Sequence, residues 1–223
     1  MRVELERWSL GKMQNPVRGF LHGTAALAGV IGTVLITMHA HTWPSRIAVL
    51  VFGLAIIALY TTSSLYHSIP WNQIAKKRMQ RLDYSMILVL IAGTYTPVLA
   101  VVFDGQVRIM ALMVVWGIAI AGLIQNLFFP GVPHWFSVTL STTLGWLGLF
   151  IIWPLTTRVG LMAMGLVLVG GGLYTIGMVF LVTNRPRLWP RVFSYHEAFH
   201  VLVVSATSVH FLVIWRYMVP LAR

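Results

Sequence analysis

Seven apolar segments, each roughly 20 residues long, dominate this chain of 223 residues. A helix of about 20 residues spans the hydrocarbon of a bilayer, because each residue adds about 1.5 Å along its axis. Membrane barrels would instead show shorter segments of alternating polarity. We therefore expect an all-α membrane protein, a bundle of seven transmembrane helices, whose spans cover residues 19–38, 46–66, 84–103, 108–129, 135–156, 160–182 and 196–219.

The composition supports this expectation. Charged residues make up only 9% of the chain, whereas soluble domains contain about 25%, so the chain cannot cover a water-facing surface. We predict two parts, an N-terminal tail (residues 1–18) and a single transmembrane domain (residues 19–219). The tail contains glutamates at positions 4 and 6 and no apolar core, unlike a signal peptide. The absence of cysteine excludes disulfides and thiolate ligands for a metal.

The net charge of +11 indicates how the bundle is oriented. The basic residues form short clusters between the apolar segments and no continuous stripe, which argues against a nucleic-acid partner. A cytoplasmic N-terminus places eleven basic residues inside, namely Arg2, Arg7, Lys12, Arg18, Lys76, Lys77, Arg78, Arg81, Arg185, Arg187 and Arg191. The outer segments hold five, namely Arg46, Arg108, Arg158, Arg216 and Arg223. The positive-inside rule then predicts a cytoplasmic N-terminus and an outer C-terminus in the cytoplasmic membrane of the cell.

The longest predicted loop, residues 68–83, contains the four basic residues that follow the second span. Such a cluster can also attract anionic lipid head groups. Membrane lipids are therefore the expected partners, and the sequence contains no sign of a particular protein partner.

The most distinctive motif is His196-Glu197-Ala198-Phe199-His200, at the start of the last apolar segment. Residues four apart lie on one face of a helix, so both imidazoles can bind the same cation. Ionisable side chains at membrane depth are costly and mark functional sites. The motif therefore predicts half of a metal site inside the membrane domain.

The alternating direction of the spans brings further candidates to the same depth. His67 ends the second span, Asp83 begins the third, and Ser63 precedes His67 by one helical turn. Three imidazoles with a fourth position open for water form a common catalytic zinc site. Asp83 could hold that water or act as its base. Imidazole also suits copper, iron and nickel.

The remaining candidates have plainer expected roles. Glu197 completes an H-E-x-x-H pattern, in which it could act as a base, but we favour a hydrogen bond to a neighbouring helix or ligand. His22, at the inner start of the first span, could support the metal ligands from behind, but we favour helix packing or a backbone hydrogen bond. His210 lies about 15 Å beyond His200 along the helix and cannot join the same metal. His39 and His41 belong at the opposite face, His134 belongs to a loop, and Gly170, Gly171 and Gly172 predict close helix packing.

Six short motifs carry a family resemblance, at residues 15–23 (NP…HG), 63–67 (SSLYH), 81–84 (RLDY), 92–97 (AGTYTP), 171–177 (GGLYTIG) and 196–200 (HEAFH). With these motifs, residues 15–215 resemble the hemolysin III family, the bacterial branch of the progestin and adipoQ receptor superfamily, which includes the adiponectin receptors. The resemblance implies a zinc ion bound by His67, His196 and His200, with Asp83 near the zinc-bound water and Ser63 near the metal. One departure is that residues 11–15 (GKMQN) lack the glutamate that many members carry before the asparagine.

Two classes of function remain open. The superfamily resembles alkaline ceramidases, which predicts a zinc-dependent hydrolase acting on a lipid amide or ester near the inner leaflet. Asp83 and Ser63 would then be the catalytic residues, with Ser63 donating to the developing oxyanion. The alternative is a non-enzymatic cytolytic, pore-forming or receptor-like protein with structural zinc. An intramembrane protease is less favoured, because the best third ligand, His67, lies upstream in another helix.

Overall fold

A computed structural model describes residues 13, 15–129, 131–189 and 192–221. Seven helical segments in these residues are long and apolar enough to cross a membrane, which confirms the predicted number of spans. The first four are α1 (Pro16–His39), α2 (Trp43–Ser68), α3 (Gln73–Val102) and α4 (Gly105–Phe128). The fifth combines α5 (His134–Trp146), a 3₁₀ segment (Leu147–Ile151) and α6 (Ile152–Val159). The last two are α7 (Leu161–Thr183) and α8 (Tyr195–Val213), and α8 continues as a π-helical turn (Ile214–Met218).

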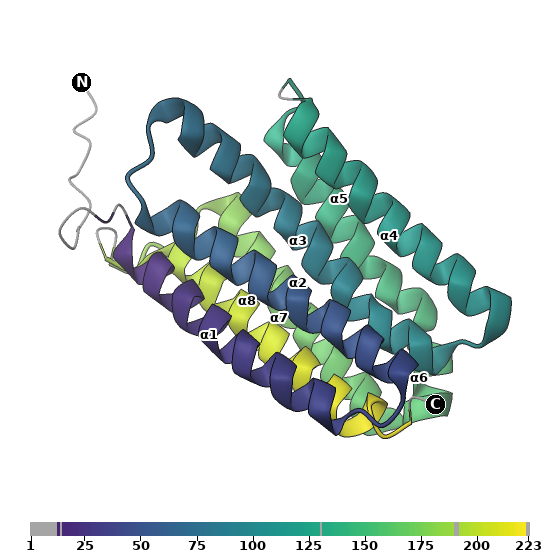
Figure 1. Ribbon diagram of the computed structural model, residues 1–223. Helices are drawn as coiled ribbons and strands as arrows, with labels where there is room; N and C mark the ends of the chain where they lie inside the picture. Colours follow the sequence, from purple (N-terminus) through teal and green to yellow (C-terminus); the bar gives the residue numbers. More distant parts are fainter. Residues whose placement is uncertain (1–12, 14, 130, 190–191, 222–223) are drawn as a thin grey trace, which may run out of the picture.

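The bundle is built around α2 and α3, which are the most buried of the seven spans (Figure 1). Fully buried side chains such as Phe52, Leu88 and Leu99 pack between the helices, while large apolar side chains such as Met113 and Phe150 are exposed. An apolar exterior suits hydrocarbon, because a helix satisfies its own backbone hydrogen bonds and needs no water. The distribution of apolar residues therefore matches a multi-pass membrane protein.

The fifth span is broken, although the sequence predicted one regular helix. Pro154 has no N–H to donate to the carbonyl one turn earlier, and Gly145 and Gly148 have low helix propensity. The Tyr95 hydroxyl of α3 lies 3.1 Å from the carbonyl oxygen of Leu144 and 3.0 Å from that of Gly145, so it donates to the carbonyls at the break. A kink inside a membrane is tolerated where a neighbouring helix satisfies the freed groups in this way.

The third helix begins eleven residues before the predicted span, so the long loop predicted at residues 68–83 is wrong. The connection between α2 and α3 covers only residues 69–72. The Asn72 side chain accepts a hydrogen bond of 2.9 Å from the backbone N–H of Ala75 and so caps the helix. The basic residues that follow are good helix formers, which extends α3 below its apolar part.

Chain direction gathers four helix ends at one end of the bundle. The start of α1, the end of α2, the start of α3 and the start of α8 lie together there, and the last described residues lie at the opposite end (Figure 1). α1 already begins at Pro16, so Arg18, assigned to the predicted tail, belongs to the bundle. Residues 1–12 and 14 of the predicted tail, Arg191 and Arg223 lie outside the described residues. The side of the membrane that each end faces stays a prediction from charge.

Candidate metal centre

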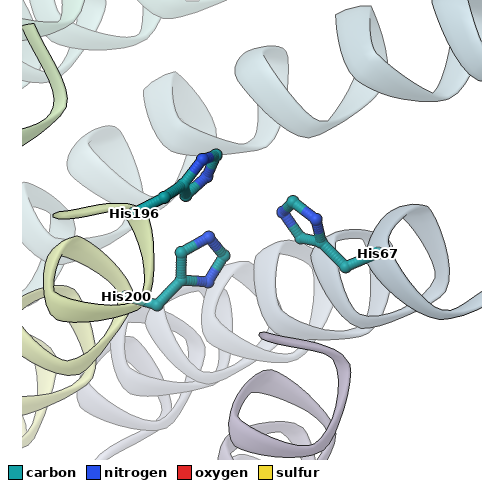
Figure 2. A group of neighbouring side chains, drawn as sticks. All are labelled: His67, His196 and His200. Carbon is teal, nitrogen blue, oxygen red and sulfur yellow. The ribbon is translucent and has the colours of Figure 1, made fainter. Parts of the chain in front are cut away.

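Three histidines converge at this end of the bundle. His67 lies in the last turn of α2, and His196 and His200 lie in the first two turns of α8. One ring nitrogen from each falls within 4.8 Å of the other two, and the imidazoles turn toward a common space (Figure 2). The ring centroids of His67 and His196 each lie 4.9 Å from that of His200. The structure thus brings together the three residues that the sequence analysis selected.

This donor set suits one metal ion. Three imidazoles from two helices leave a fourth position open, as in catalytic zinc sites. Zinc–nitrogen bonds are about 2.0–2.1 Å long, so small side-chain rotations would bring the three nitrogens onto one ion. Because hard cations such as Mg²⁺ and Ca²⁺ prefer oxygen ligands, the site is better matched to a transition metal or zinc.

Asp83 and Ser63 lie beside the histidines. The Asp83 carboxyl of α3 is hydrogen-bonded to the Ser63 hydroxyl of α2, and both side chains are buried. Both residues also line the same cavity as His67. This hydrogen-bonded pair therefore lies in the wall of the cavity that the three histidines also line.

The first helix contributes contacts that the sequence analysis missed. Nδ1 of His200 lies 2.9 Å from Nε2 of His22, so the expectation of mere helix packing or a backbone bond for His22 is corrected. One turn earlier on α1, Nε of Arg18 donates to Oε1 of Glu197 at 2.7 Å. The signal was present in the spacing, since Arg18 and His22 are four apart and can meet Glu197 and His200, which are three apart.

Glu197 fixes the start of α8. Its Oε1 accepts from Arg18, and its Oε2 accepts from the backbone N–H of Ser194 at 2.8 Å. Ser194 and Glu197 together form a capping box, which satisfies the free N–H groups of the first turn. The hydrogen bond to a neighbouring helix that we favoured for Glu197 is present. Because both oxygens are engaged in these bonds, the carboxylate supports the start of the helix.

A cavity of about 590 Å³ extends from the histidines into the bundle. Its walls come from α2, α3, the fifth span, α7 and α8, together with His22 of α1. They are mostly apolar, with Ile87, Val98, Leu149, Leu168 and Met178 among the lining residues. A chamber of this size and character can hold a hydrocarbon chain.

The three consecutive glycines of α7 have two different roles, since one packs against a neighbouring helix and two line the cavity. A methyl group added to Gly170 would collide with the His210 imidazole, so close packing is correct there. A methyl group on Gly171 or Gly172 would meet no atom within 4 Å, and both residues line the cavity. The packing interpretation is therefore wrong for these two positions.

The other described histidines stand apart from the centre. Nε2 of His210 lies 3.2 Å from the carbonyl oxygen of Val167 on α7, beside a hydrogen-bonded group of Tyr60, Thr207 and Tyr174. His39, the last residue of α1, and His41, in the connection to α2, are exposed, as expected. The His39 ring stacks on Trp215.

Comparison with known proteins agrees with the motifs. A family model described as "Haemolysin-III related" matches residues 11–211. Hemolysin-3 from Bacillus cereus is 31% identical over 204 residues, which cover 90% of each chain. The human monocyte to macrophage differentiation factor is 21% identical over 89% of this chain and 82% of its own. The chain therefore belongs to the hemolysin III family, within the progestin and adipoQ receptor superfamily.

Proposed function

We propose that the protein is a zinc-dependent membrane hydrolase that cleaves a lipid amide or ester. The observation that carries this proposal is the cluster of His67, His196 and His200 in the wall of a mostly apolar cavity. Asp83 and Ser63 line the same cavity. A structural metal site needs no carboxyl beside it and no chamber for a substrate.

Zinc is the metal we propose. Zinc held by three imidazoles makes a coordinated water more acidic and polarises a carbonyl group. His200 would bind it through Nε2, because its Nδ1 is engaged by His22. His67 and His196 supply the other two nitrogens.

The protein's own residues handle the proton. We assign Asp83 as the general base that takes a proton from the attacking water and passes it to the departing amine or alcohol. The Ser63 hydroxyl orients the Asp83 carboxyl through their hydrogen bond, and it can reach the oxyanion only by leaving that bond. Water and the lipid are thereby converted to a carboxylic acid and an amine or alcohol.

The position of the site suggests how the substrate is oriented. The histidines lie at the same end of the bundle as the basic residues of early α3, which by the positive-inside rule faces the cytoplasm. A lipid of the inner leaflet would place its head group near the metal and its hydrocarbon chain in the cavity. Membrane lipids, and one lipid substrate, are thus the proposed partners, and the cytoplasmic membrane is the proposed location.

The competing function is a cytolytic, pore-forming or receptor-like role with structural zinc. It is suggested by the name Hemolysin-3 of the Bacillus cereus relative. A pore needs polar side chains along its full depth. In the described residues, the cavity wall is mostly apolar away from the histidines, which favours hydrolysis.

The test compares purified wild-type protein with Asp83→Asn on ceramide-type amides and phospholipid esters. We expect Asp83→Asn to retain zinc but to lose at least about 100-fold in hydrolysis, because a general base contributes 10²–10⁴-fold. Asp104→Asn is the matched control, since Asp104 is exposed and pairs with Arg158 near the start of α4. Wild-type protein that hydrolyses nothing, yet conducts ions in liposomes without zinc, would replace this proposal with the pore.

A further inference from the structure

His22, which lies outside the group of three candidate ligands, contacts one of them. His22 lies on α1, which supplies none of the three histidines, and its Nε2 is 2.9 Å from Nδ1 of His200. His22 and His200 are both buried, at 3% and 2% exposure, so no bulk water competes for this bond.

The hydrogen bond determines which nitrogen of His200 is available to a metal. A neutral imidazole has one N–H and one lone pair, and a metal takes the lone pair. When Nε2 of His200 binds a metal, its Nδ1 must carry the proton. That proton is donated to Nε2 of His22, which therefore accepts, and the proton of His22 resides on its own Nδ1.

The surroundings of His22 agree with a dedicated acceptor. Its Nδ1 is buried and has no hydrogen-bond partner among the described residues. A buried unpaired donor is costly, so a residue needed only for packing would be better apolar. The ring of His22 is held edge-on to Tyr60, with centroids 4.9 Å apart. The Arg18–Glu197 ion pair one turn away fastens α1 to α8 and preserves the contact.

We propose that His22 is a positioning residue, which holds His200 in the tautomer with Nδ1 protonated and so directs its Nε2 toward the metal. This proposal rests on the proposed metal site. Partners of this kind raise the basicity of a metal ligand and fix its ring, and their loss lowers metal affinity about 10–100-fold.

Two variants of His22 separate hydrogen bonding from packing. In His22→Gln, the side-chain amide reaches the place of Nε2 and can accept from His200. In His22→Asn, the side chain is shorter, so its amide takes the place of Nδ1 and cannot reach Nδ1 of His200. His210→Leu is the matched control, because His210 is another histidine packed between two helices but lies about 15 Å further along α8.

The measurement is zinc affinity by chelator competition on detergent-purified protein, together with the visible spectrum of the Co²⁺-loaded form. Thermal unfolding of the metal-free variants checks that each is folded. We expect His22→Asn to bind zinc about 10–100-fold more weakly with an altered Co²⁺ spectrum, while His22→Gln and His210→Leu stay close to wild type.

Three results would overturn the proposal in distinguishable ways. Equal affinity in wild type and His22→Asn removes any role for His22 while leaving the metal site intact. Equal losses of zinc affinity in His22→Gln and His22→Asn would mean that the shape of the His22 ring matters and that its hydrogen-bond acceptor does not. If wild-type protein binds no zinc, both the proposed function and the proposed role of His22 are wrong.

Discussion

At the scale of single residues, the candidate centre depends on how each polar side chain is held in an apolar bundle. His200 has one nitrogen toward His22 and the other available to a metal. Asp83 is bonded to Ser63, and Glu197 to Arg18 and Ser194. Buried polar groups persist only when such partners satisfy them. The candidate ligand His200 and the candidate base Asp83 are therefore each held by a neighbouring helix, His200 by His22 of α1 and Asp83 by Ser63 of α2.

The buried Arg18–Glu197 pair yields a prediction of stability. Glu197→Gln retains the capping box, since glutamine can accept from the Ser194 N–H, but leaves the Arg18 charge without its carboxylate. We expect a loss of about 3–5 kcal/mol in the free energy of unfolding, measured by denaturant titration in detergent micelles.

Asp104→Asn provides the comparison for this prediction. It breaks the other ion pair of the described residues, whose Arg158 and Asp104 side chains are 52% and 70% exposed. Exposed pairs contribute at most about 1 kcal/mol, so the two losses should differ clearly. Equal losses would mean that the Arg18–Glu197 pair does not fasten α1 to α8.

At the scale of the helices, α7 shows how one short motif serves two purposes. Gly170 lets the His210 imidazole approach the backbone of α7, whereas Gly171 and Gly172 leave space for the cavity. Three consecutive glycines look identical in the sequence. They differ in the structure because successive residues of a helix point about 100° apart.

Gly170→Ala and Gly171→Ala test this division. We expect Gly170→Ala to destabilise the fold by about 1–3 kcal/mol, because its methyl group overpacks against His210. Gly171→Ala should be neutral or stabilising by up to about 1 kcal/mol, because alanine favours the helix and meets no neighbour. Thermal unfolding of the two purified variants measures the difference, and the reverse order would contradict the packing described for α7.

At the scale of the whole molecule, the sequence was sufficient for the number of spans and for the convergence of His67, His196 and His200. Span length and chain direction place His67, Asp83 and His196 at one end without any knowledge of helix packing. Span length and chain direction do not give the contact between His22 and His200, because it depends on how far α1 is rotated about its axis. Only the spacing of Arg18 and His22 against Glu197 and His200 hints at it. The early start of α3, the broken fifth span and the cavity likewise depend on capping and on contacts between helices.

The orientation of the molecule is open to a direct test. The chain has no cysteine, so a single introduced cysteine reports its own accessibility. We expect Lys77→Cys in intact cells to resist a membrane-impermeant thiol reagent, and Arg158→Cys to react, because the positive-inside rule assigns the basic start of α3 to the cytoplasmic side. Both residues are exposed in the structure, so burial does not account for a difference. Reaction of Lys77→Cys but not of Arg158→Cys would mean that the bundle has the opposite orientation in the membrane.

The central claim is that one metal ion joins α2 and α8. Elemental analysis of purified wild-type protein beside His67→Ala and the control His210→Ala tests it most directly. We predict about one zinc ion per chain in wild type and in His210→Ala, and very little in His67→Ala, since two histidines alone bind zinc weakly. Equal zinc in wild type and His67→Ala would contradict a centre shared by the two helices.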